Sequence, residues 1–214
     1  MTSKKPRGRM TGAERREQLI VVARGLFAER GFDGTAIEEV ATQAGVSKPV
    51  VYEHFGGKEG LYAVVVDREV THLLSMMRDA LSAGGSSRQL LEDAVCALLD
   101  YIEASPDGFR ILVRDSPIGA SNATYQTLIG DIATRVEGLL GERFREQKLD
   151  PRTAPMYAQM LVGMIGAVGQ WWLGERKPAK EVVAAHLVNL AWNGLSGMTA
   201  KPILSRTAED DVPA

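Results

Sequence analysis

The sequence has one cysteine, three histidines and few aromatic residues, and each shortage argues against a class of protein. Cys96 alone cannot form an internal disulfide or a cysteine-rich zinc site. Three scattered histidines argue against a metal-centred enzyme, so we expect no metal and no cofactor. The longest apolar stretch, residues 160–173, is interrupted by Gln170 and is shorter than the roughly 20 residues of a membrane-spanning helix. No apolar run follows the basic N-terminus, which favours a cytoplasmic protein over a secreted one.

What the sequence does contain is typical of a soluble globular chain of 214 residues, with 45% hydrophobic and 24% charged residues. Its charge is unevenly distributed. Residues 1–58 hold ten Lys and Arg against seven Asp and Glu, whereas the remainder is acidic and the whole chain carries −2. The first nine residues contain Lys4, Lys5, Arg7 and Arg9 and no acid. A basic end on an acidic body favours a polyanion partner, and a merely solvated tail is the alternative.

Three short helices are predicted at the N-terminal end. Thr11 and Glu14 form a capping-box pattern, and apolar residues at helical spacing then continue to about Arg30. A second capping box is expected at Thr35 and Glu38, before a helix that ends near residues 44–45. Ser47 is a third candidate N-cap, with a helix of only eight residues, 48–55, behind it.

Small Ala41 lies in the last turns of the second predicted helix, and Gly45 follows at its end, before the third. A small residue permits close helix packing and a glycine permits a sharp turn, so the pattern predicts a helix-turn-helix. The second helix of such a motif enters the major groove of DNA.

The run Gly45-Val-Ser-Lys48, Tyr52-Glu-His-Phe55 and Lys58-Glu59 carries a family resemblance. Together with the preceding Phe32-Asp-Gly-Thr35, it resembles the DNA-binding domain of the TetR family of bacterial transcriptional regulators over about residues 12–62. Glu53 departs from the pattern, because an aromatic or polar residue is common there. The resemblance implies a helix-turn-helix domain followed by a helical domain that binds a small molecule and dimerises.

The chemistry of these residues suits DNA. Lys48 can donate to the O6 and N7 atoms of guanine or to phosphate, and Pro49 and Val50 can contact a thymine methyl group. Tyr52 and Lys58 suit phosphates, Lys58 at the start of a helix whose N-terminal end attracts anions. His54 is either a second phosphate donor or a ring packed under the fourth helix. The predicted DNA-contacting residues are Thr35, Ala36, Ile37, Ser47, Lys48, Pro49, Val50, Tyr52, His54 and Lys58.

The rest of the chain is predicted to be helical. Apolar periodicity with glycine and proline breaks indicates helices over about 58–83, 87–104, 107–114, 122–147, 151–175 and 178–198. We therefore expect an all-α fold with a basic arm at 1–10, in contact with DNA or without fixed order, and a helix-turn-helix domain at 11–57. A ligand-binding and dimerisation domain at 58–200 and a disordered tail at 201–214 complete the expected organisation.

Two C-terminal helices are apolar nearly all round, and residues 156–173 are the clearest case. Such a helix must be buried on more than one side, which favours a homodimer over a larger monomeric core. The resemblance implies the same arrangement. The predicted interface residues are Gly166, Gly169, Leu173, Val188, Trp192 and Leu195.

A small, largely apolar ligand is implied by the resemblance. Methionine is adaptable and recurs at permissive apolar surfaces, although plain core packing is the alternative. The predicted pocket residues are Leu73, Met77, Leu98, Phe109, Tyr125, Ile129, Met160, Met164 and Trp172.

The resemblance implies a repressor that a small-molecule effector releases from DNA. Together with the observations above, it predicts a homodimer on a palindromic operator in double-stranded DNA. Two alternatives remain open at this point: a ligand-independent or protein-responsive DNA-binding regulator, and an α-helical enzyme. The enzyme is disfavoured because His72 and His186 lie in no recognisable catalytic pattern with a nucleophile or a carboxylate.

Overall fold

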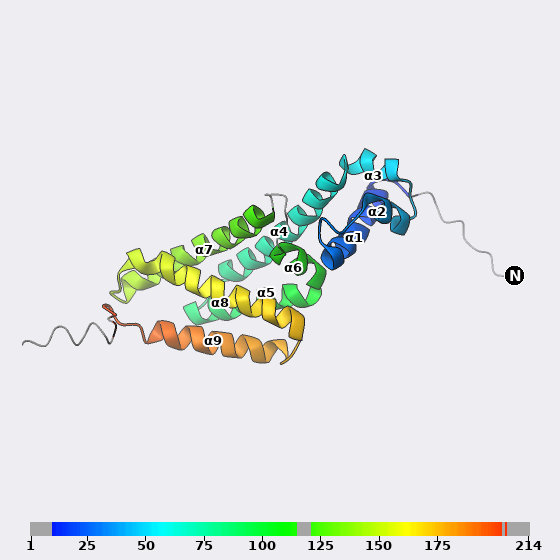
Figure 1. Ribbon diagram of the computed structural model, residues 1–214. Helices are drawn as coiled ribbons and strands as arrows, with labels where there is room; N and C mark the ends of the chain where they lie inside the picture. Colours follow the sequence, from blue (N-terminus) through cyan, green and yellow to red (C-terminus); the bar gives the residue numbers. More distant parts are fainter. Residues whose placement is uncertain (1–9, 115–120, 203, 205–214) are drawn as a thin grey trace, which may run out of the picture. The chain divides into compact units, whose positions relative to one another are not determined.

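The computed structural model describes residues 10–114, 121–202 and 204, with only the backbone of 121–126 (Figure 1). These residues form helices and no strand, which confirms the all-α expectation. Arg9 and the other arm cations, and nearly all of the predicted tail, lie outside the described residues. The elements are α1 (Gly12–Arg30), α2 (Ile37–Ala44), α3 (Lys48–Phe55), α4 (Lys58–Ser82), α5 (Ser87–Ala104), α6 (Pro106–Val113), α7 (Ser121–Glu146), a 3-10 turn (Pro151–Thr153), α8 (Ala154–Glu175) and α9 (Lys180–Ser196).

The chain divides into two compact units. The first contains residues up to 73 and residues 105–126, so α6 belongs with α1 to α3 and the beginning of α4. The second contains residues 74–104 and everything from 127 onwards. Helix α4 therefore contributes to both units. The domain boundary predicted at residue 58 stays a prediction.

Helix α1 begins and ends as its sequence predicts. The hydroxyl of Thr11 accepts from the backbone N–H of Glu14 at 3.2 Å, and the Glu14 carboxylate accepts from the Thr11 N–H at 2.7 Å, which completes the capping box. Two bonds to the Thr11 backbone and hydroxyl hold the pKa of Glu14 below its usual value. Leu19 and Phe27 are fully buried, so the predicted apolar face is the packed one.

An aromatic cluster joins α1 to α4. The ring of Phe27 meets Tyr62 edge to face with 4.9 Å between centroids, and Phe32 meets the same Tyr62 at 5.1 Å. Edge-to-face pairs add to the stabilisation that burial alone gives. The cluster fixes the start of α4 against the helix that precedes the helix-turn-helix.

Helix α4 buries a carboxylate in its apolar stripe. Tyr62, Val66 and Leu73 are buried at helical spacing. Glu69 is buried with them, at 8% exposure, whereas its apolar neighbour Val70 is half-buried. A buried carboxylate requires compensating partners, since desolvation opposes its charge.

Arg24 of α1 and Ser105 supply those partners. The Nε atom of Arg24 lies 2.8 Å from Oε1 of Glu69, an ion pair in which the buried Nε–H makes no well-aligned hydrogen bond. The Ser105 hydroxyl donates to Oε2 of Glu69 at 3.0 Å, and Arg24 also reaches Ser105. Gly108 must be a glycine here, because a Cβ on it would lie 1.9 Å from Oε2 of Glu69. One cluster thus connects α1, α4 and α6.

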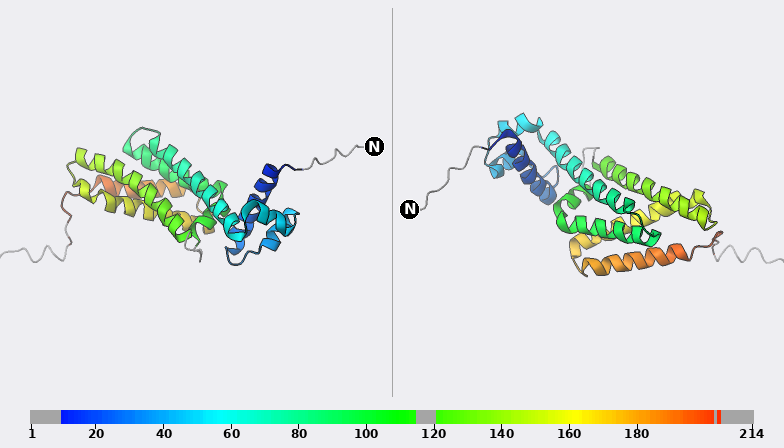
Figure 2. Two further views of the ribbon diagram at one scale, coloured as in Figure 1. Left: turned by 90° about the horizontal axis from the view of Figure 1, so that it is seen from above. Right: turned by 180° about the vertical axis from the view of Figure 1, so that it is seen from behind.

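The second unit is organised around α5, which packs against α8 and α9 (Figure 2). Lys180 at the start of α9 donates to Asp100 at 2.7 Å and to Glu103 at 2.6 Å, and these bonds raise the pKa of the Lys180 ammonium. Over the described ranges, no helix is both long and apolar enough to cross a membrane.

We predict that Glu69→Ala lowers the free energy of unfolding by about 1–3 kcal/mol, because it removes the partner of a charged group that is one-third exposed and can turn partly to water. Urea denaturation followed by circular dichroism measures the change. Asp67→Ala, at an exposed position of the same helix, is the control and should stay within about 0.5 kcal/mol. Equal effects of the two variants would contradict the role given to the cluster.

Candidate nucleic-acid interface

Helix α3 presents its first turn to solvent. Gly45 adopts a left-handed φ of +67°, and the N–H of Val46 donates to the carbonyl of Ala41 at 2.9 Å, which closes the turn between α2 and α3. Ser47 is the N-cap residue, as predicted, although its side chain makes no capping hydrogen bond. Lys48 and Pro49 follow it and are exposed.

The opposite side of α3 is packed inward. Val51 has no exposed surface, and Val50 is half-buried. Tyr52 is 46% exposed, which is unusual for a large aromatic side chain and suits a role in binding. The helix therefore offers the predicted Lys48, Pro49 and Tyr52 to a partner and uses Val51 to hold its position.

Lys48 contacts two groups of its own chain. Its Nζ lies 2.5 Å from Oε1 of Glu38 and 5.5 Å from the centre of the Tyr52 ring. The bond between them raises the pKa of the Lys48 ammonium and lowers the pKa of the Glu38 carboxyl. The sequence predicts only a capping role for Glu38, because its partner Lys48 lies ten residues further along the chain.

The capping box predicted at Thr35 and Glu38 is wrong. The N-cap residue of α2 is Ala36, without a side-chain capping bond. Thr35 is buried at 2% exposure, and its hydroxyl donates to the carbonyl of Gly31 at 2.8 Å, near the end of α1. The end of α1 competes with the α2 cap for this hydroxyl. A buried hydroxyl must form a hydrogen bond, and the carbonyls at the end of a helix lack partners within the helix. Ile37 is also buried, so what α2 offers an anion is its first-turn backbone N–H groups.

Lys58 and His54 are both half-buried. The ammonium of Lys58 lies 4.4 Å from the centre of the Phe32 ring and 3.3 Å from the carbonyl oxygen of Asp33. The ring of His54 lies at 6.1 Å from that of Phe55. Both side chains stand at the connection from α3 to α4, where a partial role in packing accompanies any contact with DNA.

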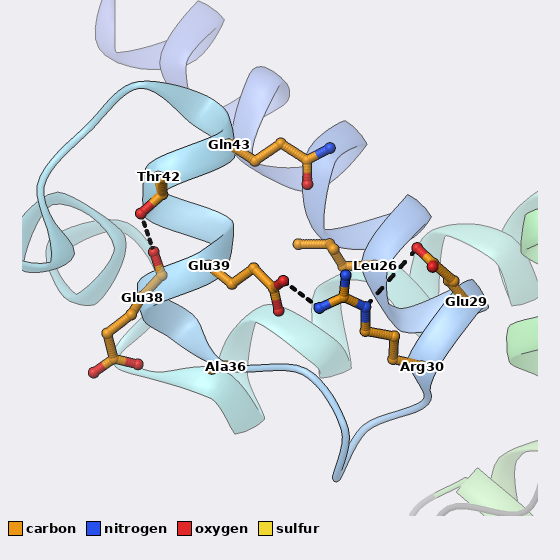
Figure 3. A pocket seen from close by; sticks show the side chains of 8 residues that line it. All are labelled: Leu26, Glu29, Arg30, Ala36, Glu38, Glu39, Thr42 and Gln43. Carbon is orange, nitrogen blue, oxygen red and sulfur yellow. Dashed lines mark hydrogen bonds and ion pairs between the residues drawn. The ribbon is translucent and has the colours of Figure 1, made fainter.

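A shallow groove lies between α1 and α2 (Figure 3), lined by Leu26, Glu29, Arg30, Ala36, Glu38, Glu39, Thr42 and Gln43. Figure 3 shows Glu38 and Glu39 on opposite sides of the first turn of α2, with Glu39 directed to Arg30. Three carboxylates against one guanidinium make this groove unsuitable for phosphates.

The predicted ligand residues differ in burial. In the first unit, Leu73 and Phe109 are buried. In the second unit, Met77, Leu98 and Trp172 are buried, and the Trp172 indole N–H donates to the carbonyl of Pro178 at 2.8 Å. Ile129 and Met164 are half-buried, Met160 is 55% exposed, and the side chain of Tyr125 lies outside the described residues.

Some of the predicted interface residues are buried by contacts within the chain itself. Gly169, Leu173 and Val188 are buried within a single copy, whereas Gly166, Trp192 and Leu195 are half-buried. The large apolar side chains that are exposed on α8 and α9 are instead Met156, Met160, Trp171, Val182 and Leu190. In the described part of the chain, no group of three or more His, Cys, Asp or Glu side chains is placed to hold a metal ion.

Two family models match the chain. Residues 19–65 match the model described as bacterial regulatory proteins of the tetR family, and residues 76–205 match a tetracyclin repressor-like C-terminal domain. The first match contains the whole helix-turn-helix, and the second contains most of the second unit.

Known transcriptional regulators resemble the chain in sequence and in structure. The transcriptional activator FasR of Mycolicibacterium smegmatis is 33% identical over 189 residues, which are 88% of this chain and 86% of FasR. A TetR-like regulator from Rhodococcus sp. RHA1 has a similar structure, with a TM-score of 0.72 and 25% identity over 89% of this chain and all of that one.

The regulator FadR of Bacillus subtilis, solved with stearoyl-CoA, has a TM-score of 0.67 at 17% identity, over 86% of this chain and 99% of FadR, and shows the fold alone. We conclude from the exposed first turn of α3, the two family matches and the similarity to FasR over most of both chains that the protein is a DNA-binding transcriptional regulator and belongs to the TetR family.

Proposed function

We propose that two copies of this chain bind a pseudo-palindromic operator through α3 and that an apolar ligand of the second unit releases them. The observation that carries the proposal is the first turn of α3, where Lys48, Pro49 and Tyr52 are exposed beside a buried Val51. One such turn contacts too few bases to be selective, whereas two recognition helices about 34–36 Å apart read two half-sites.

The homodimer is supported by an apolar stripe on α8. Met156, Met160 and Trp171 are each about half exposed, and their spacing of four and eleven residues places them on one face of the helix. Small Ala167 lies on the same face. Contiguous apolar surface on a soluble chain marks an interaction site, and a second copy covers it most simply because each copy carries the same stripe.

We further propose a long-chain acyl thioester as the effector. The regulator FadR, which shares this fold, is described in complex with stearoyl-CoA, and this supports the ligand class named here. The buried Met77 and Leu98 give the second unit an apolar interior suited to a hydrocarbon chain.

Transcriptional activation is the second candidate outcome, since FasR is named an activator. The same binding event represses or activates according to where the operator lies relative to the promoter. A reporter fused to the operator region, compared in cells with and without the gene for this chain, distinguishes the two outcomes by the sign of the change.

We predict different effects of two lysine substitutions on DNA selection from a random duplex pool. Lys48→Ala should change the preferred base at one position of each half-site, with a loss of discrimination of roughly tenfold or more. Lys58→Ala should weaken binding to all duplexes alike and reduce the salt slope by about 1. A thermal melt of each variant reports any loss of the Phe32 contact, and a changed base preference in Lys58→Ala would show that the roles are wrongly assigned.

Trp171→Glu should convert the dimer to monomers and reduce operator affinity at least tenfold, because it places a charge in the apolar stripe of α8. Sedimentation velocity measures the change in mass. The matched control is Gln170→Glu, which adds the same charge at the adjacent exposed position and should remain dimeric. A dimeric Trp171→Glu variant would place the interface elsewhere.

Stearoyl-CoA should weaken operator binding by about 5- to 150-fold, the usual range of coupling between an effector site and a second site. Free coenzyme A, which lacks the hydrocarbon chain, should have no effect in the same fluorescence-anisotropy titration. Tighter binding with stearoyl-CoA would contradict release, and an unchanged affinity would reject this ligand class.

A further inference from the structure

Glu38 lies in the first turn of α2 and forms an ion pair with Lys48 of the recognition helix. It is exposed, and its side chain is directed away from Arg30, which pairs with the adjacent Glu39 (Figure 3). Helix N-termini favour negative charge, but a carboxylate at this end also repels the phosphates that the proposed function brings close.

The partner of Glu38 is the single Lys or Arg side chain of α3. The helix reads Lys-Pro-Val-Val-Tyr-Glu-His-Phe, so Lys48 is its single Lys or Arg. The Lys48 ammonium lies 2.5 Å from the Glu38 carboxylate and 5.5 Å from the centre of the Tyr52 ring. These two contacts favour one position of the flexible lysine side chain on the surface of the helix-turn-helix.

We infer that Glu38 is a specificity-determining residue that acts through Lys48, an inference that rests on the proposed operator binding. A lysine ammonium has three N–H donors, so one bond to Glu38 leaves two for the O6 and N7 atoms of a guanine. On the operator, Glu38 positions Lys48 for that base. On other duplexes, Lys48 must leave Glu38 before it can neutralise a phosphate, so the carboxylate suppresses non-specific binding.

The charges explain why the effect falls on specificity rather than on folding. Both side chains are about half exposed, and exposed ion pairs contribute little to stability. Non-specific binding, in contrast, depends almost wholly on how many phosphates the protein neutralises. Removing the carboxylate frees one cation for phosphates without altering the fold.

The test compares Glu38→Gln with the unmodified full-length chain on the selected operator and on a scrambled duplex of equal length. On the scrambled duplex, the slope of log K against log salt concentration should steepen by about 0.9. Lowering salt from 200 to 50 mM should then increase affinity about three- to fourfold more than for the unmodified chain. Operator affinity should change less than twofold, so the specificity ratio falls.

Two controls separate positioning from a general charge effect. Glu39→Gln makes the same charge change one residue away, at the partner of Arg30, and should leave the ratio unchanged. In a Lys48→Gln background, Glu38→Gln should leave the specificity ratio unchanged, because direct repulsion between the carboxylate and phosphates acts on both duplexes alike. An unchanged ratio in Glu38→Gln, an equal effect of Glu39→Gln, or a change in the ratio that persists without Lys48 would each overturn the inference.

The outcome for the unmodified chain keeps the two proposals apart. If it prefers no duplex over any other, operator binding itself is rejected. If it selects a palindrome while Glu38→Gln behaves identically, only the role of Glu38 is rejected.

Discussion

An isolated helix of eight residues is not stable in water, so the recognition helix α3 depends on its contacts with the rest of the first unit. Helix α3 is held by the burial of Val51 and by the left-handed turn at Gly45, which joins it to α2. Because Val51 faces the interior, the opposite side of the helix can carry residues that bind a partner. Lys48, Pro49 and Tyr52 occupy that side.

The same unit uses paired charges in two environments. Arg24 and Glu69 meet in a largely buried setting, where the Ser105 hydroxyl also donates a hydrogen bond to the Glu69 carboxylate. A pair of this kind specifies how α1, α4 and α6 fit together, because each group is costly without its partner. Lys48 and Glu38 meet at the surface, where water weakens the attraction and either group can exchange its partner. The buried pair therefore suits a structural role and the exposed pair a binding role.

The second unit shows a different distribution of apolar side chains. Several residues that are apolar in sequence are buried within one copy, with Leu173 and Val188 among them, while Trp171 and Leu190 remain at the surface. Helix α5 packs against one side of α8 and one side of α9. What remains exposed is the surface that the proposed homodimer would cover.

Residue patterns were enough to predict the helices, the turn before α3 and the family. The capping box at Thr11, the glycine after α2 and the apolar periodicity of α4 act between residues a few positions apart, so their outcome is local. Tertiary structure decided the partners of the polar side chains. Thr35 and Glu38 fit a local capping box, yet Thr35 bonds to the end of α1 and Glu38 to Lys48. Glu69 likewise fits an exposed position until α1 and α6 enclose it. These hydrogen-bond partners depend on which distant donors and acceptors folding brings into contact. They also depend on which polar groups burial would leave without a partner.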